Sequence, residues 1–386
     1  MYFELNEEQR MYQEAVRDFC DRELAPYAAQ VDQTGEMRWE AIRKMPQLGL
    51  TGLQVPEEYG GAGLDSISAA IAIEEVGRAC GSTGLSLAAH NGLGCFPINR
   101  WGTTDQKQKY LPRLTSGEVL GALALTEPNA GSDLVGGVRT SAVKEGDSWI
   151  IDGHKAWITN PKHAPVIITL TRTNKEAGAK GFCMLLVEPQ YAGVTVHHPE
   201  KKMGLKGSPT QQITYDNVRV PIVEGTLGEE GKGFHQTMET LDGGRISIGA
   251  LSVGLAQAAF EAAMKYAAER EAFGSKITQF QAIQWMIADA ALEIEAARLL
   301  VYRAAWLKDQ GKNFTKEAAM AKLMASEVAE KVSFNAIQIH GSYGYSQEFP
   351  VERIYRDQRL MTIGEGTSQI QRLVIARRVL QEYGLG

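Results

Sequence analysis

Residues 166–187 read VIITLTRTNKEAGAKGFCMLLV and hold two β-rich runs, 166–170 and 182–187, joined by a polar segment. No long helical pattern separates these runs from each other or from their neighbours. Two further β-rich runs lie at residues 149–151 and 212–215. Asp152-Gly153 and Asp216-Asn217 follow them and are expected to form turns. A small antiparallel barrel or sandwich is therefore expected here, rather than a βαβ fold.

Helical patterns flank this β-rich zone on both sides. Near the start, Asn6 followed by two glutamates predicts a helix N-cap. Toward the end, long alanine-rich patterns without proline predict helices, and their apolar stripes predict a four-helix bundle. These four helices are expected at residues 246–271, 277–310, 315–341 and about 368–383. The expected fold is α+β, with a helical N-terminal domain (1–120), a central antiparallel β-barrel domain (121–230) and a C-terminal four-helix bundle domain (231–386).

Composition narrows the class of protein. The 386 residues are 44% hydrophobic and 22% charged with a net charge of -6, which is typical of a soluble globular protein and predicts no nucleic-acid surface. The four scattered cysteines predict neither disulfides nor a zinc site. The acidic start resembles no targeting segment, and the apolar stretch 246–260 is too short to span a membrane. We therefore expect a cytoplasmic bacterial protein, or a mitochondrial matrix protein in processed form.

Several catalytic motifs are missing. No Gly-x-Gly-x-x-Gly opens a βα unit, so a Rossmann nicotinamide site is unsupported. Gly231-Lys232 resembles the end of a P-loop, but Gly233 replaces the required Ser or Thr. None of the seven histidines follows a glutamate by three residues, which argues against a di-iron bundle, and no Gly-x-Ser-x-Gly elbow is present. We predict no metal site.

Three polar segments remain as candidates for chemistry. Glu365 is a lone carboxylate with glycine on both sides, between two helical stretches, and glycines let a backbone approach a ligand closely. The loop TEPNAGSD (126–133) offers hydroxyls and backbone N–H groups where helices give way to strands. The segment AWITN (156–160) places a Trp beside a Thr, which suits a flat ring. Taken singly, each is equally an ordinary turn or a core Trp.

Together these segments resemble the acyl-CoA dehydrogenase family, in particular its short- and branched-chain members of the butyryl- and isovaleryl-CoA type. The resemblance runs nearly end to end. Its strings are PEEYGG (56–61), TEPNAGSD (126–133), WITN (157–160), KMGLKGS (202–208), LDGGR (241–245), REAFG (270–274), QIHG (338–341) and the Glu365 segment.

The resemblance implies a fatty-acid β-oxidation enzyme that converts acyl-CoA to trans-2-enoyl-CoA. It implies a homotetramer, a dimer of dimers with FAD in each subunit, which passes electrons to an electron-transfer flavoprotein. Glu365 would be the base, with the Gly366 backbone beside the substrate. The residues implied at the flavin are Leu125, Thr126, Trp157, Ile158 and Thr159, with Ser132 where the CoA and FAD phosphates approach. Those implied at CoA are Asp242 and Arg245. Those implied at the FAD of a neighbouring subunit are Arg270, Phe273, Gln281, Gln338, Gly341 and Ser342, while Thr367 and Gln369 would hold its phosphates.

Two positions depart from family patterns. Short straight-chain members often have Tyr where this chain has Gly364, so we expect the space beside the acyl tail to admit branched or medium-length chains. In isovaleryl-type members the base precedes the CoA-binding arginine, and here that residue is Gly244, which leaves Glu365 as the base. A dry pocket is expected to raise the pKa of Glu365 toward ~6–7. Two alternatives stay open, an acyl-CoA oxidase and a non-catalytic FAD-binding scaffold.

Overall fold

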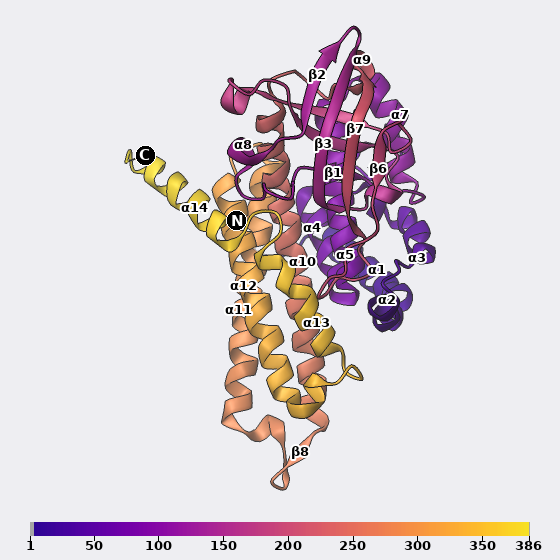
Figure 1. Cartoon of the computed structure of the whole chain (residues 1–386). Helices are drawn as coiled ribbons and strands as arrows, with labels where there is room; N and C mark the ends of the chain where they lie inside the picture. Colours follow the sequence, from indigo (N-terminus) through magenta and orange to yellow (C-terminus); the bar gives the residue numbers. More distant parts are fainter. Residues whose placement is uncertain (1–3, 386) are drawn as a thin grey trace.

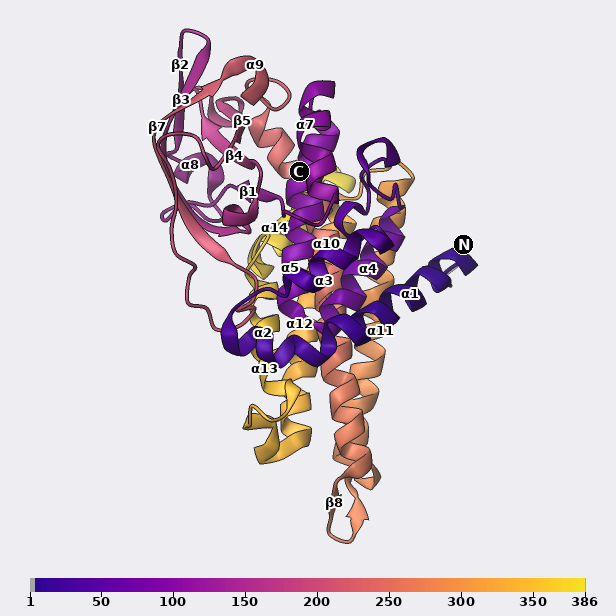
Figure 2. The ribbon, with the colours of Figure 1, turned by 90° about the vertical axis from the view of Figure 1, so that its right-hand side faces the viewer.

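The computed structural model describes residues 4–385 and consists of a helical part, a curled sheet and a second helical part. In Figures 1 and 2 the sheet lies at one end of the molecule beside the N-terminal helices, and the C-terminal helices extend away from it to a small hairpin. This is the three-domain α+β architecture that the sequence predicts. The division at residues 120 and 230 stays a proposal, placed in the connections Ser116–Gly121 and Thr226–Lys232.

The N-terminal part begins with the expected cap. The Asn6 side chain accepts from the Gln9 backbone, and the Gln9 side chain bonds back, so a capping box starts the first helix. A π-helix, His90–Cys95, interrupts the later helices next to the C-terminal bundle. The helices of this part are α1 (Glu7–Glu23), α2 (Ala28–Thr34), α3 (Trp39–Lys44), α4 (Ser66–Ala79), α5 (Gly81–Ala89), α6 (Phe96–Trp101) and α7 (Thr104–Thr115).

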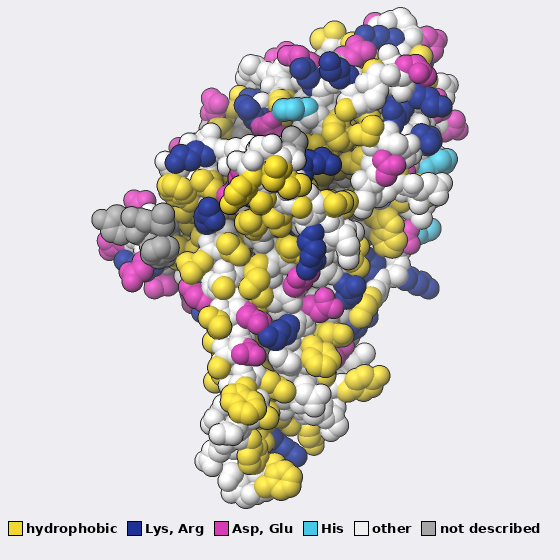
Figure 3. Space-filling view, turned by 90° about the vertical axis from the view of Figure 1, so that its left-hand side faces the viewer, with side chains coloured by type: hydrophobic (Ala, Val, Ile, Leu, Met, Phe, Trp, Pro, Cys, Tyr) yellow, Lys and Arg dark blue, Asp and Glu magenta, His cyan; other side chains and the backbone are white. Residues whose placement is uncertain are grey.

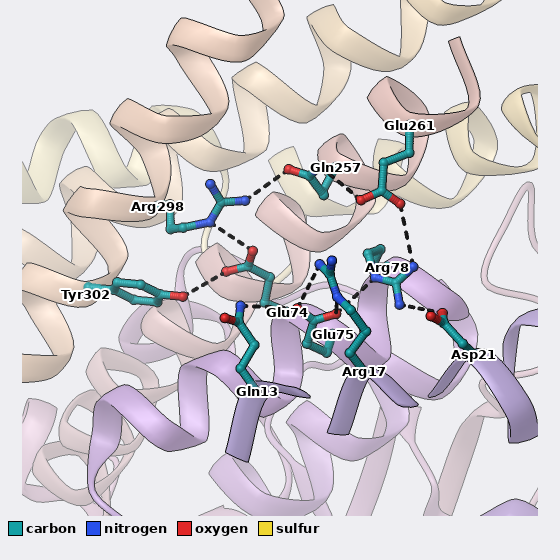
Figure 4. Close-up of polar contacts among 10 residues, drawn as sticks. All are labelled: Gln13, Arg17, Asp21, Glu74, Glu75, Arg78, Gln257, Glu261, Arg298 and Tyr302. Atoms are coloured by element: carbon teal, nitrogen blue, oxygen red, sulfur yellow. Dashed lines mark hydrogen bonds and ion pairs between the residues drawn. The ribbon is translucent and has the colours of Figure 1, made fainter. Parts of the chain in front are cut away.

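A buried polar network ties α1 and α4 to the C-terminal helices (Figure 4). Glu75 is fully buried and accepts from Arg17 of α1 and from Arg78, at 3.0 and 2.9 Å. Its neighbour Glu74 accepts from Arg298 of the bundle at 2.9 Å. Buried carboxylates need such partners because an unpaired buried charge is costly. The network therefore fixes how the N-terminal helices sit on the bundle.

The middle part is one seven-stranded sheet in the order β1-β4-β2-β3-β7-β6, with β5 also paired to β4. Most pairs are antiparallel, as expected, but β1 runs parallel to β4 (Ala122 opposite Ile167). All four predicted β-rich runs lie in strands. The elements are β1 (Ala122–Ala124), α8 (Leu134–Gly137), β2 (Ser141–Glu145), β3 (Ser148–Thr159), β4 (Ile167–Arg172), β5 (Phe182–Val187), β6 (Val194–Val196), β7 (Thr210–Pro221) and α9 (Ile222–Gly225).

The two expected turns at Asp152-Gly153 and Asp216-Asn217 were wrong. Both dipeptides lie inside long paired strands, where the register of β3 against β7 shifts between Ile151 and Gly153. The Asp152 side chain accepts a hydrogen bond from the Asn217 backbone N–H at 2.8 Å. This N–H therefore has a partner where the regular strand pairing is interrupted. Turn-forming residues here make a β-bulge instead of ending the strand.

The C-terminal part is built on α10, which contacts α11, α12, α13 and α4. It begins at Gly233, thirteen residues before the expected start. The expectation that this apolar stretch is too short to span a membrane was therefore wrong as to length. By length and composition α10 is sufficient to cross a membrane, but 67% of its most apolar window is buried within the protein, as in a bundle core. The last helix projects from the body (Figure 1). The elements are α10 (Gly233–Glu269), β8 (Glu271–Ala272), β9 (Ser275–Lys276), α11 (Gln281–Asp309), α12 (Thr315–His340), α13 (Pro350–Gln358) and α14 (Ser368–Glu382).

Candidate active site

Glu365 lies in the short connection between the 3-10 helix Arg359–Thr362 and α14. Its own backbone is left-handed, with φ 52°, and Gly366 follows with φ 95°. Non-glycine residues seldom adopt such angles, and when they do they cluster at functional sites. Gly364, in contrast, has no positive φ, and a Cβ there would lie 3.6 Å from Leu360, an ordinary contact. The strain is therefore carried by the glutamate itself.

The Glu365 carboxylate points into a space that α10 leaves open at Gly244. A Cβ on Gly244 would lie only 2.0 Å from Glu365 Oε2. The residue as a whole is partly accessible, but Oε2 is buried and has no hydrogen-bond partner among residues 4–385. Burial raises the pKa of Glu365 to about 7, an effect that Lys322 and Arg245 partly offset. This agrees with the raised pKa expected of a carboxylate in a dry pocket.

Asp242 and Arg245 lie one turn apart on α10 and form an ion pair. Arg245 is only 5% exposed, and Asp242 also accepts from Thr315 of α12 at 2.6 Å. Because α10 starts at Gly233, these residues lie well inside the helix and not at its start. The two residues are therefore neither an exposed helix cap nor a solvated arginine, and they lie near Glu365.

The 126–133 loop follows β1 and is held by a buried ion pair. Glu127 accepts from Lys155 Nζ at 2.9 Å and from the backbone N–H groups of Arg139 and Thr140 at 2.7 and 2.9 Å. Lys155 is fully buried and also donates to the Leu125 carbonyl. These contacts fix Leu125 and Thr126 beside the end of β3, while Ser132 lies exposed farther along the loop.

Trp157 sits in a second β-bulge, where the register of β3 shifts between Lys155 and Ile158. Its φ is 62° and its side chain is 60% exposed, so a large aromatic ring stands out from the sheet. Ala156 N donates to the Thr126 carbonyl at 2.9 Å, which places the 126–133 loop next to this bulge. Ile158 is instead buried in the core of the sheet and is paired with Gln211 of β7, so its side chain does not face a ligand.

The remaining predicted residues divide into two groups. Thr367 caps α14, since its side chain accepts from the Ile370 backbone, and Gln369 lies exposed in the first turn. The other group lies at the far end of the bundle, where His340 of α12 stacks on Tyr266 of α10 with ring centroids 4.3 Å apart. That group is exposed and comprises Arg270, Phe273, Gln281, Gln338, Gly341 and Ser342.

This far group cannot join Glu365 within one chain. A helix rises ~1.5 Å per residue, so Gly244 and Glu269 are about 38 Å apart along α10. Phe273 stands at the tip of the β8–β9 hairpin and is 98% exposed. The structure thus places Trp157 beside the 126–133 loop and Glu365 beside Gly244 and Arg245 of α10, and it leaves the far group apart from Glu365.

Models of the three acyl-CoA dehydrogenase domains match the chain in order. The N-terminal domain matches residues 6–118, the middle domain 122–218 and the C-terminal domain 231–380. The chain belongs to the acyl-CoA dehydrogenase family.

Two of the similar proteins are named as acyl-CoA or butyryl-CoA dehydrogenases. The probable acyl-CoA dehydrogenase YngJ of Bacillus subtilis is 53% identical over 382 residues, covering 99% of this chain and 100% of the relative. The structure of butyryl-CoA dehydrogenase from Megasphaera elsdenii is 41% identical with a TM-score of 0.95, covering 98% and 100% of the two chains. A structure described for the electron transferring flavoprotein of Acidaminococcus fermentans is 43% identical with a TM-score of 0.96, covering 99% and 100%. The chain is accordingly an enzyme of the acyl-CoA dehydrogenase class.

Four residues of the candidate site were not predicted from the sequence. Glu127 and Lys155 support the polar loop, and Lys322 and Gln371 bond to the backbone at Glu365 and Gly366. Lys155 and Lys322 look like solvated positions in the sequence, because a lysine is almost always exposed.

Proposed function

We propose that this enzyme carries out FAD-dependent α,β-dehydrogenation of acyl-CoA thioesters to trans-2-enoyl-CoA, with Glu365 as the base. The observation that carries the proposal is the strained, buried Glu365 carboxylate with its pKa raised to about 7. A general base works best when its pKa lies near the working pH. A solvated turn would have no buried, unpaired carboxylate oxygen and no raised pKa.

The thioester must be polarised before a carboxylate can remove its weakly acidic α-proton. Glu365 N–H donates to no acceptor among the described residues, so it is available to the substrate carbonyl oxygen. Fixed donors of this kind typically supply ~3–4 kcal/mol each. The Gly366 backbone lies beside the same position. The Glu365 carboxylate then takes the α-proton. FAD, when bound by the residues named below, would supply the acceptor for the β-hydride.

The residues proposed to hold FAD offer an open aromatic and polar surface. Trp157 presents its ring outside the sheet. The Thr126 carbonyl accepts from the backbone of the residue before Trp157, and Thr126 and Thr159 are half-buried, whereas the Leu125 side chain is buried. Phe273 and Gly341 are likewise unhindered, since Phe273 is almost fully exposed and a Cβ on Gly341 would meet nothing within 4 Å. We propose that Ser132, Thr367 and Gln369 contact phosphates, and that Asp242 and Arg245 serve the CoA side.

We propose a homotetramer in which the far group serves the FAD of a neighbouring subunit. On α11 the apolar residues Trp285, Leu292, Leu299 and Trp306 recur every seven positions and are exposed, so they form one stripe on the helix. Apolar side chains also gather down the length of the bundle in Figure 3. Exposed apolar stripes mark sites of protein contact. The cytoplasmic or mitochondrial matrix location of the enzyme stays a prediction.

We propose an electron-transfer flavoprotein as electron acceptor, which the similarity to the Acidaminococcus fermentans structure supports. The test is anaerobic bleaching of the bound flavin by a panel of acyl-CoAs of different length and branching. Bleaching separates the enzyme from a non-catalytic scaffold, for which no acyl-CoA would bleach the flavin. Oxygen uptake during turnover with acyl-CoA would instead identify an oxidase.

Arg270→Ala should weaken FAD retention and subunit assembly together. The reason is that Arg270, about 38 Å along α10 from the Glu365 region, reaches a cofactor only in a neighbouring subunit, so binding and assembly are linked. Gel filtration with and without added FAD measures both. Lys276→Ala, in the same hairpin, is the matched control and should leave both unchanged. A tetrameric and fully flavinated Arg270→Ala protein would refute the shared site.

Gly364→Tyr should shift preference toward short straight acyl chains. The Gly364 backbone has no positive φ and its Cβ position is in ordinary contact with Leu360, so the chain accepts a side chain there. Each methylene in an apolar pocket changes selection by ~1–3 kcal/mol, so the change should be graded with chain length. The kcat/KM values for butyryl-, isovaleryl- and octanoyl-CoA measure it. A folded, flavinated variant with an unchanged acyl profile would show that other walls set the chain length.

A further inference from the structure

Lys322 of α12 is a buried cation, and the proposed reaction gives it no role. Its side chain is fully buried, and its Nζ donates to the Gly366 carbonyl at 2.8 Å. No carboxylate pairs directly with it among the residues that the structure describes. Lysines are seldom fully buried unless paired, so this one needs an explanation.

The hydrogen bond from Lys322 is made to the strained backbone of the Glu365–Gly366 turn. The Gly366 carbonyl accepts a second bond from Gln371 Nε2 at 2.9 Å, and the same amide lies 3.2 Å from the Glu365 carbonyl. Both Glu365 and Gly366 have positive φ. Such angles persist only where surrounding contacts impose them. Lys322 and Gln371 are the side chains that bond to this turn.

Lys322 also differs from the other cation that faces the base. Arg245, on α10, is tied to Asp242 by an ion pair, so much of its charge is compensated. The charged groups that act on Lys322 are Glu365, Arg245 and Glu327, and Glu327 is itself paired with Arg372. The charge of Lys322 is therefore directed mainly toward the Glu365 carboxylate.

We propose that Lys322 is the positioning residue of the base, fixing the Glu365–Gly366 turn through the Gly366 carbonyl and holding a positive charge beside the Glu365 carboxylate. This inference rests on the proposed role of Glu365. Burial raises the pKa of Glu365 and the nearby cation lowers it. Burial also lowers the pKa of Lys322 to about 8, so it is largely charged at neutral pH. Without Lys322, Glu365 needs a higher pH to lose its proton.

The test is the pH dependence of anaerobic flavin bleaching by saturating butyryl-CoA in Lys322→Met and Lys322→Gln holoenzymes. Met removes the charge and the bond, whereas Gln removes the charge and keeps an N–H donor. Both variants should move the rising limb of the rate upward by about one pH unit or more, the effect of a nearby opposite charge. Backbone hydrogen exchange of residues 363–367 should quicken in Lys322→Met and less in Lys322→Gln. Lys331→Met is the matched control, because Lys331 lies on the same helix but pairs with Glu293 on the surface.

The proposal is overturned if the bleaching rate rises at the wild-type pH in both variants. It is also overturned if the backbone hydrogen exchange of residues 363–367 is unchanged in Lys322→Met. If Lys322→Met does not retain flavin, the pH dependence of bleaching in Lys322→Gln decides. Glu365→Gln is measured in parallel. Should it bleach at the wild-type rate, the role of Glu365 as base fails, while the exchange measurement still judges whether Lys322 holds the turn.

Discussion

Glu365→Gln is expected to lose at least ~10²–10⁴-fold of acyl-CoA-dependent flavin bleaching, the typical contribution of a general base. The amide is nearly isosteric with the carboxylate, so it should fit the space above Gly244 and keep the fold and the yellow FAD. It has no basic oxygen to accept the α-proton. Anaerobic stopped-flow absorbance with butyryl-CoA measures the rate.

The wild-type rate should depend on pH in a definite direction. Because the base must be deprotonated and burial raises its pKa to about 7, the bleaching rate should rise as pH increases through neutrality.

The matched control for Glu365→Gln is Glu348→Gln, at an exposed position, which should bleach like the wild type. Near wild-type bleaching by Glu365→Gln would remove it from the mechanism.

Glu127→Ala is expected to destabilise the enzyme by about 3–5 kcal/mol, as when one partner of a buried ion pair is lost. The substitution leaves the fully buried Lys155 ammonium without its carboxylate, and it leaves the N–H groups of Arg139 and Thr140 unpaired. The 126–133 loop should loosen with it. Thermal unfolding followed by circular dichroism, together with flavin release, measures both effects.

The control for this loss is an ion pair on the surface of the same sheet. Glu145 pairs with Arg219 at 2.8 Å, and both side chains are more than half exposed. Exposed pairs contribute ~0–1 kcal/mol, so Glu145→Ala should leave unfolding and flavin content almost unchanged. Equal effects of the two substitutions would mean that Glu127 does no more than a surface carboxylate.

The sequence predicted the elements where one local preference dominates. The runs 166–170 and 182–187 are short, apolar and β-branched or bulky, and the structure buries every residue in them. Gly341 ended α12 as expected because its φ of 60° suits glycine. Asp152-Gly153 and Asp216-Asn217 have the same turn-forming character. Their role was set by pairing across the sheet, which a single strand does not encode.

The site was predictable where a residue type is unusual for its surroundings. A carboxylate between two glycines drew attention to Glu365, and the WITN string drew attention to Trp157. The left-handed backbone of both residues was not predictable, because it accompanies a β-bulge at Trp157 and hydrogen bonds to the Gly366 carbonyl next to Glu365. Both features depend on contacts between segments that are distant in the sequence. Lys322 was hidden because burial depends on which face of α12 meets α10 and the Glu365 turn.

The narrow separation between Gly244 and the Glu365 carboxylate has a consequence for how such enzymes diverge. A side chain at 244 and the carboxylate from 365 compete for the same volume, since a Cβ would lie 2.0 Å from Oε2. A side chain at 244 therefore forces the flexible end of Glu365 into another position. A lineage that moves its base from one position to the other by single substitutions passes through one of two intermediates. In one of them Glu365 is displaced by the new side chain, and in the other neither position carries an acid.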